Sequence, residues 1–412
     1  GYKTSPVTQS RIISGLVPCN MLPDEILTDH PDRFRGMLIE SANPVHSLAD
    51  AKRMREALGA LDLLVVIDIA MTETAKLADY VLPASSQYEK AEMAFFNFEF
   101  PENCAHLRGP LMAALPGTLS EPEIHARLLE AVDPFDDAVL ARLRQAAIEG
   151  LDSYAKAYDV AAKTNPKINQ YGAYVLYRTL GPSLPAGMAE AAAIWGIAQM
   201  FAATQGASLP REGFEGTSVE AGNKLFTALI GAQSGMVFSV DEPDDSFRRN
   251  RLPGGMVNLH LPEMLDKVKE LAGYDAAQTS DEFPLVLAAG ERRSYTANTV
   301  IRDPAWAKSN NALTLCINPD DAASLGINDG GTARLTTVRD SVDVVVEVDT
   351  RMLPGTLSLP NGLGLSYPDA AGREKVTGIS PNELTAVEAR DDFAYTPWHK
   401  FVLARLEAIG GR

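Results

Sequence analysis

The sequence has few cysteines and histidines, and none is spaced for metal binding. Cys19, Cys104 and Cys316 lie far apart in 412 residues, which excludes a zinc or iron–sulfur motif built from neighbouring thiols and argues against a disulfide framework. The six histidines include no HxH pair and no pair four residues apart, so we expect no metal site from them. The sparse, unpaired thiols favour a reducing compartment, and we predict a cytoplasmic protein.

Positive charge is also scarce, and long apolar runs are absent. Lys and Arg number 37 against 54 Asp and Glu, which gives a formal net charge of −17. Because phosphate backbones would be repelled, we expect no nucleic-acid partner. No apolar run approaches the ~18 residues that a bilayer-spanning helix needs. The sequence therefore predicts a soluble protein without a membrane-spanning segment.

Several common site motifs are missing too. The chain contains no P-loop, no GxGxxG and no GxSxG, so neither a standard nucleotide loop nor a nucleophile elbow is expected. It opens on Gly1-Tyr2-Lys3, without an initiator Met, a basic leader or an apolar signal core, and we expect it to be a piece of a longer polypeptide. Its length suits about two or three domains.

What is present begins with three apolar segments separated by helical patterns. Strands are predicted over 36–42, 62–69 and 80–82. The middle one is β-branched and apolar on both faces, as in a buried parallel strand. Ser47 is expected to cap the helix that follows the first strand. The resulting βαβαβ order predicts a parallel sheet of the kind that forms a nucleotide crevice.

Polar residues follow the first two of these strands. Asn43 and Pro44 come after the first strand, where Asn could bond phosphate or sugar oxygens and Pro sets the turn. Asp68 ends the second strand, and its carboxylate could accept hydrogen bonds from guanine or from ribose hydroxyls. Further candidates at the same rim are Thr72, Thr74 and Asp79. Each could instead only cap a helix or stabilise a turn, but as a group they favour a nucleotide site.

The remaining pattern divides the chain further. Residues 1–132 are predicted as an α/β dinucleotide-binding domain, 133–280 as a mainly helical connecting region without recognisable chemistry, and 281–412 as a β-barrel. In the last region Asn318 is expected to cap a helix with Pro319 at its first position. The predicted barrel strands cover 285–289, 313–317, 332–337, 343–348 and 355–359.

A loop after the first barrel strand gathers side chains that suit a polar ligand. It runs from Gly290 to Asn298 and contains two arginines, hydroxyls and an amide. Arg offers forked donors and Gly lets backbone N–H groups approach, so the loop suits a pyrophosphate or a fused polar ring. A solvated loop is the alternative. Two further polar turns, at 361–364 and 382–385, are weaker signals.

Taken together, these segments resemble the carboxyl-terminal half of a molybdopterin oxidoreductase of the dimethyl-sulfoxide-reductase type, the group of formate dehydrogenases and nitrate reductases. One similar block runs from Ala42 to Glu89 and resembles the family's central dinucleotide domain. The other runs from Phe283 to Thr385 and resembles its final double-psi β-barrel.

The resemblance implies a cofactor and its contacts. The cofactor would be molybdenum bis(molybdopterin guanine dinucleotide). One guanosine would be held by the residues of the first block, which are Asn43, Pro44, Asp68, Thr72, Thr74 and Asp79. Pterin and pyrophosphate would be contacted from the barrel by Gly290, Glu291, Arg293, Ser294, Tyr295 and Asn382.

The departures from the family pattern matter equally. Family members carry an amino-terminal Cys cluster for [4Fe-4S] and a Cys, selenocysteine, Ser or Asp that binds molybdenum, and nothing before residue 36 supplies either. We therefore predict no catalytic or metal-binding residue in this chain and expect it to be inactive without an amino-terminal part of the same polypeptide. An electron-transfer partner is also implied. The alternatives are a non-catalytic scaffold subunit of a respiratory complex and a small nucleotide-binding regulator.

Overall fold

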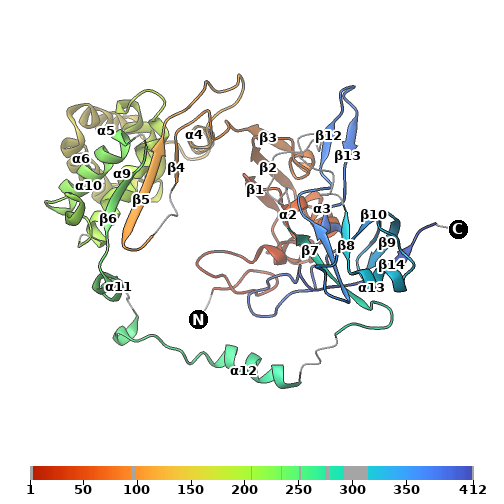
Figure 1. Ribbon diagram of the computed structural model, residues 1–412. Coiled ribbons are helices and arrows are strands. Elements are labelled where there is room, and N and C mark those ends of the chain that lie inside the picture. The colour runs from red at the N-terminus through yellow and green to blue at the C-terminus, as the bar shows by residue number, and fades with distance from the viewer. Residues whose placement is uncertain are drawn as a thin grey trace. The chain divides into compact units, whose positions relative to one another are not determined.

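The computed structural model describes residues 3–94, 99–205, 207–232, 234–249, 252–273, 278–291 and 314–410. The chain forms two compact units (Figure 1). The first unit combines the two ends of the chain, Gly1–Leu82 and Gly273–Arg412, and the second unit is Pro83–Ala272. The second unit is thus inserted into the sequence of the first. The predicted three-part division at 132 and 280 stays a prediction.

The amino-terminal part of the first unit is a small α/β sheet. Its strands are β1 (Gly36–Glu40), β2 (Leu63–Asp68) and β3 (Tyr80–Pro83), in the order β1-β2-β3. β1 and β2 are parallel, with Gly36 opposite Leu63. Its helices are α1 (Leu22–Leu27), α2 (Pro44–Ser47) and α3 (Ala51–Gly59). Met54 and Leu58 of α3 pack with Ile39, Leu64 and Val66 of the strands, which places the apolar helix face on the sheet.

The start of α3 differs from the prediction. Ser47 ends the four-residue helix α2 instead of capping α3, and its Oγ donates to the Asn43 carbonyl (3.0 Å). Asp50 is the cap, and its Oδ1 accepts a hydrogen bond from Arg53 N (3.0 Å). Asp50 has a left-handed backbone (φ 58°), a conformation that Asp tolerates better than most residues. Pro44 explains the difference, because it starts a separate short helix just before the predicted cap.

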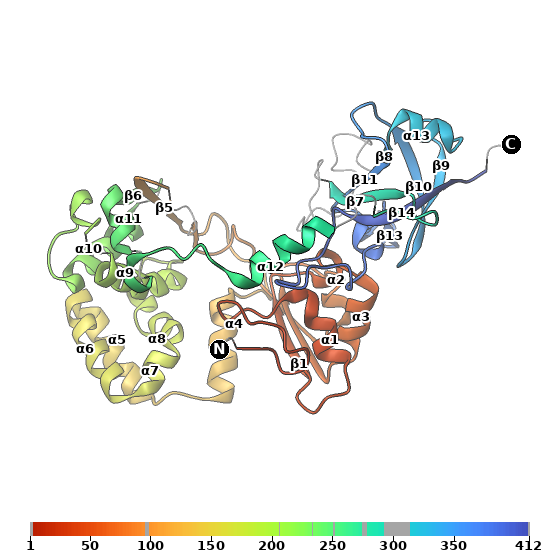
Figure 2. The same cartoon turned by 90° about the horizontal axis from the view of Figure 1, so that it is seen from below.

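The carboxyl-terminal part of the first unit is a closed β-barrel (Figure 2). The strand order β10-β8-β11-β7-β14-β9 closes on itself, and aliphatic side chains such as Leu287, Leu335 and Leu357 fill the interior. The barrel strands are β7 (Leu285–Glu291), β8 (Leu315–Ile317), β9 (Thr332–Thr337), β10 (Ser341–Val348), β11 (Thr356–Pro360) and β14 (Val402–Ala408). The predicted closed barrel and mixed α/β class are confirmed, while its double-psi topology stays a prediction.

Two smaller elements accompany the barrel. Helix α13 (Pro319–Ser324) is capped as predicted, since Asn318 accepts a hydrogen bond from Asp320 N (2.9 Å). A hairpin is formed by β12 (Ser366–Pro368) and β13 (Glu374–Val376).

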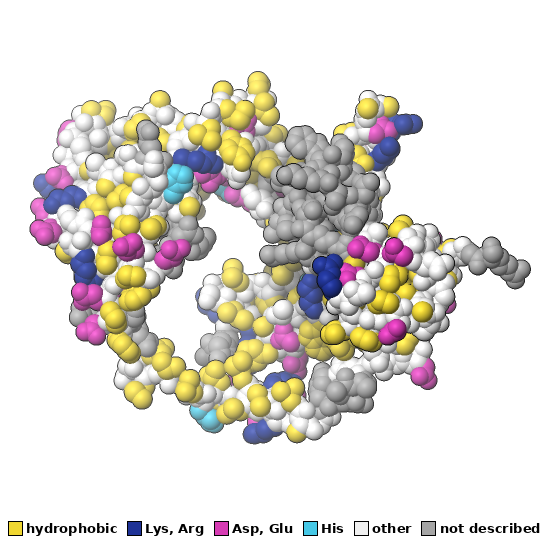
Figure 3. Space-filling model, in the orientation of Figure 1, with side chains coloured by type: hydrophobic (Ala, Val, Ile, Leu, Met, Phe, Trp, Pro, Cys, Tyr) yellow, Lys and Arg dark blue, Asp and Glu magenta, His cyan; other side chains and the backbone are white. Residues whose placement is uncertain are grey.

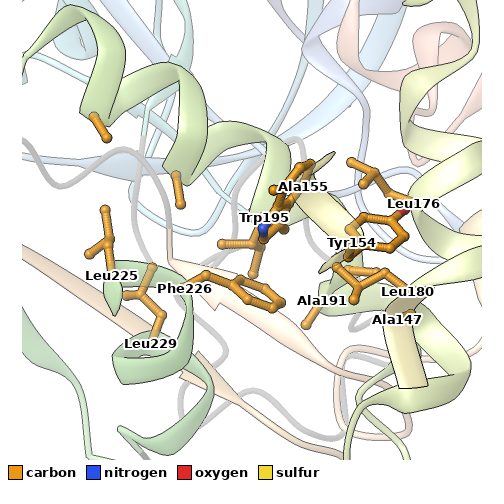
Figure 4. Close-up of a cluster of buried hydrophobic side chains, with 14 of the residues drawn as sticks. Ala147, Tyr154, Ala155, Leu176, Leu180, Ala191, Trp195, Leu225, Phe226 and Leu229 are labelled. Atoms are coloured by element: carbon orange, nitrogen blue, oxygen red, sulfur yellow. The ribbon is translucent and has the colours of Figure 1, made fainter. Parts of the chain in front are cut away.

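The second unit packs helices on a three-stranded antiparallel sheet. The strands are β4 (Glu92–Ala94), β5 (Glu102–Arg108) and β6 (Met236–Val240), in the order β4-β5-β6. Its core surrounds Tyr154, Trp195 and Phe226 (Figure 4). The helices are α4 (Glu121–Val132), α5 (Asp137–Glu149), α6 (Leu151–Thr164), α7 (Pro166–Gln170), α8 (Gly172–Thr179), α9 (Ala192–Thr204), α10 (Ser218–Gly231), α11 (Pro243–Arg249) and α12 (Pro262–Glu270).

Short 3₁₀ helices complete the fold. In the first unit these include η1 (Cys19–Met21), η2 (Ala75–Leu77) and η10 (Pro381–Glu383), and in the second unit η3 (Gly181–Ser183), η4 (Ala189–Ala191), η5 (Pro210–Glu212) and η6 (Pro253–Gly255), with η7 (Leu271–Gly273) at the boundary. In the part of the chain that the structure describes, no helix has both the length and the apolar character needed to cross a bilayer.

Candidate functional site

The turns after β1 and β2 are joined by a network of side-chain hydrogen bonds. Asn43 Nδ2 donates to Glu73 Oε2 (2.8 Å), and Asn43 Oδ1 accepts from Thr74 N (3.2 Å) and Thr74 Oγ1 (2.8 Å). Thr74 is fully buried, and its Oγ also accepts from Val45 N (3.2 Å). The two predicted residues Asn43 and Thr74 therefore meet at the carboxyl ends of neighbouring strands, as the sheet topology requires.

Asp68 and Thr72 lie in the second of these turns. Asp68 Oδ1 accepts from Ala70 N (3.2 Å), and Thr72 Oγ1 accepts from Ala75 N (3.1 Å). Thr72 is nearly buried, whereas Asp68 is partly exposed. Both side chains hold the backbone of the turn.

Asp79 is not brought together with the other predicted residues. It directly precedes β3, and its Oδ2 accepts from Leu64 N (2.7 Å) near the start of β2. Asp68 stands at the other end of the same strand. Four residues along a strand correspond to about 13 Å, so Asp79 and Asp68 mark opposite edges of the sheet.

A cavity of about 430 Å³ with several polar side chains in its wall lies elsewhere in the first unit. Two of the predicted residues, Gly290 and Asn382, are in its wall. The described residues that line it are Ser47, Ala289, Gly290, Asn361, Pro381, Asn382, His399 and Lys400. None of them carries a carboxylate, and Lys400 brings a positive charge. In a chain with a net charge of −17, this is a local environment suited to an anion.

Lys400 and Asn361 hold the end of β7 at this cavity. Lys400 Nζ donates to the carbonyl oxygens of Ala289 (3.0 Å) and Gly290 (2.7 Å), and Asn361 Nδ2 donates to the latter as well (3.3 Å). Gly290 has φ +86°, and a Cβ there would lie 2.6 Å from Asn361 Nδ2. Only glycine fits this combination of backbone conformation and close approach.

His399 adds a titratable group to the same wall. Its carbonyl accepts from Ala289 N (2.8 Å), which ties it to β7. Burial, with a smaller contribution from the Lys400 ammonium, lowers the pKa of His399 below its ordinary value of 6.5. The imidazole is therefore mainly neutral at pH 7 and can both donate and accept a hydrogen bond.

The turn at 382–385 fastens the barrel to the α/β part of the first unit. Asn382 Nδ2 donates to the His46 carbonyl (2.7 Å). Glu383 forms a two-pronged ion pair with Arg55 (2.7 and 2.7 Å). Asn382, predicted as a ligand contact, thus also has a structural bond that positions it in the cavity wall.

A buried carboxylate strengthens this junction. Asp50 is fully buried, and its Oδ1 lies 2.7 Å from Arg339 Nη2. Asp50 N also donates to Thr385 Oγ1 (3.1 Å). The sheet turns and the barrel cavity are consequently held in fixed positions within one unit.

The remaining predicted residues follow Gly290. Glu291 is the last residue of β7, and its backbone pairs with Pro360. Arg293, Ser294 and Tyr295 lie outside the described residues. In their place the structure adds His399 and Lys400, which sequence reasoning missed. The signal that could have found them is the alternation Val402, Ala404, Leu406 directly afterwards, since residues that lead into a barrel strand lie at a barrel end.

Two family models match the chain, and each matched segment contains one part of this site. Residues 21–101 match the family model described as "Molybdopterin oxidoreductase", and residues 285–403 match "Molydopterin dinucleotide binding domain". The first segment contains the Asn43–Thr74 network. The second contains the cavity residues from Ala289 to Lys400.

Curated proteins agree with these matches. The probable oxidoreductase YoaE of Bacillus subtilis is 23% identical over 392 residues, which cover 93% of this chain and 47% of that protein. A formate dehydrogenase alpha subunit of Methanocaldococcus jannaschii is 46% identical over 66 residues, covering 16% of this chain and 10% of that protein. A trimethylamine-N-oxide reductase of Vibrio vulnificus is 41% identical over 63 residues, covering 15% and 8%. The chain spans about half the length of the Bacillus relative.

A solved structure shows the same fold. Acetylene hydratase from Pelobacter acetylenicus superposes with a TM-score of 0.55 at 15% identity, covering 97% of this chain and 47% of that one. The ordered segment matches and the sequence relatives agree: the chain contains a molybdopterin oxidoreductase segment at residues 21–101 and a molybdopterin dinucleotide-binding segment at residues 285–403, and its relatives include a formate dehydrogenase and a trimethylamine-N-oxide reductase.

Proposed function

We propose that this chain is the cofactor-binding part of a molybdenum-dependent oxidoreductase that acts on a small substrate by redox, oxo or hydride transfer, as in formate dehydrogenases or related enzymes. The observation that supports this best is the cavity at the end of β7. Its described wall offers Lys400, His399, two amides and a hydroxyl, and no carboxylate. Such a donor set favours the pyrophosphate or the polar pterin ring of a dinucleotide.

The residues present fit such a group. The cavity volume of about 430 Å³ falls in the range of about 300–1,000 Å³ that is usual for ligand sites. Gly290 keeps its backbone free of a Cβ beside Asn361.

The turns after β1 and β2 are the proposed guanosine-binding side. Asn43 and Thr74 pre-organise the two turns, and Asp68 presents a carboxylate that could accept hydrogen bonds from guanine. Pro44 and Thr72 set the backbone beside them. Asp79 has no part in this proposal, because its carboxylate is bonded at the opposite edge of the sheet. The guanine form and the presence of two dinucleotides are part of the proposal.

The division of labour follows from the chemistry of the group. When bound, molybdenum and its dithiolene ligands supply the electron and atom transfer, and the protein supplies binding, orientation and electrostatics. The chain's own residues would bind the anionic part and hold it between the sheet turns and the barrel. We propose that a companion polypeptide segment supplies the molybdenum ligand and any [4Fe-4S] cluster, and that the chain alone is inactive. An external electron partner completes the scheme.

Pyrophosphate binding tests the proposal directly. In calorimetric titrations the purified chain should bind pyrophosphate, and Lys400→Met should weaken binding about tenfold, the effect of losing one charge-assisted contact. Lys375→Met is the matched control, because Lys375 lies exposed on the β12–β13 hairpin and should leave the affinity unchanged. Equal affinity of all three proteins, or no binding at all, would refute the proposal.

A second measurement separates an enzyme from a scaffold. The chain is purified from cells that make molybdopterin, then denatured, and the released pterin is measured by fluorescence together with molybdenum. Pterin in the wild-type sample and its loss in Lys400→Met support the enzyme. Pyrophosphate binding with neither pterin nor molybdenum would favour the non-catalytic alternatives.

A further inference from the structure

Residues 252–273, at the end of the second unit, are exposed at every position although they include nine large apolar residues. Leu259 is 87% exposed and Met256 is 74% exposed. Figure 3 shows hydrophobic side chains along this part of the chain, at the lower edge of the view. Contiguous apolar surface of this extent marks an interaction site in a soluble protein. We call residues 252–273 the exposed segment.

Its helix, α12, has the pattern of a helix that docks on another surface. Met264, Leu265 and Val268 follow the i, i+1, i+4 spacing that places side chains on one face, and no residue of α12 is buried. The charged side chains pair among themselves, as in Lys267–Glu270 (3.0 Å) and Lys269–Asp266 (2.8 Å). A helix of nine residues is shorter than the ~12–15 that are marginally stable alone in water, so it needs a partner.

Charge narrows the class of partner. α12 carries two lysines and three acidic residues, which gives it no net attraction to an anionic membrane surface. Docking on a second copy of the chain is the other outcome that the experiment below distinguishes.

The relatives indicate where a partner surface is found. The alignment to YoaE covers 93% of this chain but 47% of YoaE, and the superposition on acetylene hydratase covers 97% of this chain but 47% of that one. The exposed segment also lies outside both family-model matches, 21–101 and 285–403.

We propose that the exposed segment is the docking surface for the polypeptide that makes up the other half of the Bacillus relative, with α12 laying its apolar face into a groove there. At 100° per residue, Lys267 and Lys269 flank that face on opposite sides, each paired with an acidic residue of α12, so we expect the groove to have polar rims. The inference rests on the proposed function, since the same companion polypeptide completes the enzyme there.

Co-expression tests the docking. The tagged chain is produced in one cell with the half of YoaE that it does not match, so that the two can fold together. The tagged chain is then purified, and the molar ratio of the YoaE half to the tagged chain is measured. We expect equal recovery, and at least about tenfold slower amide exchange over 262–270 than in the chain alone. Leu265→Asp with Val268→Asp should reduce recovery about tenfold, because both acids would enter the groove unpaired.

A matched control and three contrary outcomes make the test decisive. Glu263→Gln changes a position on the other side of α12 and should leave recovery unchanged. Failure to recover the companion, or recovery that survives the double Asp change, overturns the inference. The inference is also overturned if the chain alone forms dimers or binds vesicles and if Leu265→Asp with Val268→Asp abolishes that dimerisation or vesicle binding. Pyrophosphate binding should persist in every variant, so its loss would instead count against the proposed function.

Discussion

Replacing Asp50 should weaken the junction between the sheet and the barrel of the first unit. Asp50 caps α3, has a left-handed backbone and faces Arg339 at 2.7 Å, with no exposed surface of its own. Losing the cap costs about 1 kcal/mol, and Ala in the left-handed conformation costs about 1–2 kcal/mol. Leaving a buried charge unpaired costs about 3–5 kcal/mol, but the partly exposed side chain of Arg339 (28%) puts this contribution below that range.

Two substitutions separate these contributions. Asp50→Ala removes the helix cap, the residue type that tolerates the left-handed backbone, and the charge pair with Arg339. We therefore expect the free energy of unfolding of the first unit to fall by about 4 kcal/mol. Asp50→Asn keeps the cap and tolerates the backbone, so it reports the charge pair alone, about 2 kcal/mol. Urea titrations followed by hydrogen exchange of barrel and α3 peptides would measure the first unit separately. Both variants within about 0.5 kcal/mol of the wild type would refute the reasoning, because surface substitutions produce changes of that size.

Three further predictions address the cavity and the second unit. The pKa of His399 is lower in the folded chain than its ordinary value of 6.5, so the unfolded chain binds the proton more readily. The free energy of unfolding of the first unit should therefore fall as the pH decreases from 6.5 through the folded-state pKa. If His399→Gln showed the same dependence of stability on pH as the wild type, the assignment to His399 would be wrong. Gly290→Ala should cost the first unit about 1–2 kcal/mol, because of φ +86° and the contact with Asn361; wild-type stability in urea titration would show the backbone to be less constrained. Phe226→Ala should cost the second unit about 3–5 kcal/mol in hydrogen-exchange-monitored unfolding, because Phe226 is fully buried, and a loss of pyrophosphate affinity would contradict separate cores.

The sequence predicted the elements whose physics is local. The strands at 36–40 and 63–68 were visible because each is a short, β-branched or aliphatic run that a polar turn ends. The cap of α13 was visible because Asn318, Pro319 and the acidic residues follow the usual order of a helix start. The last barrel strand was missed, since Val402–Ala408 follows a long stretch of turns that gives no periodic signal.

The candidate site was predictable only as far as strand ends are. Asn43 and Asp68 each follow or end a strand, so parallel pairing places them at one edge. Asp79 precedes its strand instead of following it, which places it at the other edge. The alternation of Val402, Ala404 and Leu406 could have placed His399 and Lys400 at a barrel end, but only the pairing of β14 with β7 places them beside Gly290.

The junction around Asn382 has a consequence for synthesis of the protein. Its bond to His46 joins residues 336 positions apart, and the whole second unit is translated between them. At about 5–20 residues per second, the sheet turns leave the ribosome roughly 15–70 s before their barrel partners exist. During that interval the nascent first unit has an unpaired Asp50 and an uncovered flank, while the second unit can already fold. Chaperone dependence is therefore expected to concentrate on residues 36–82.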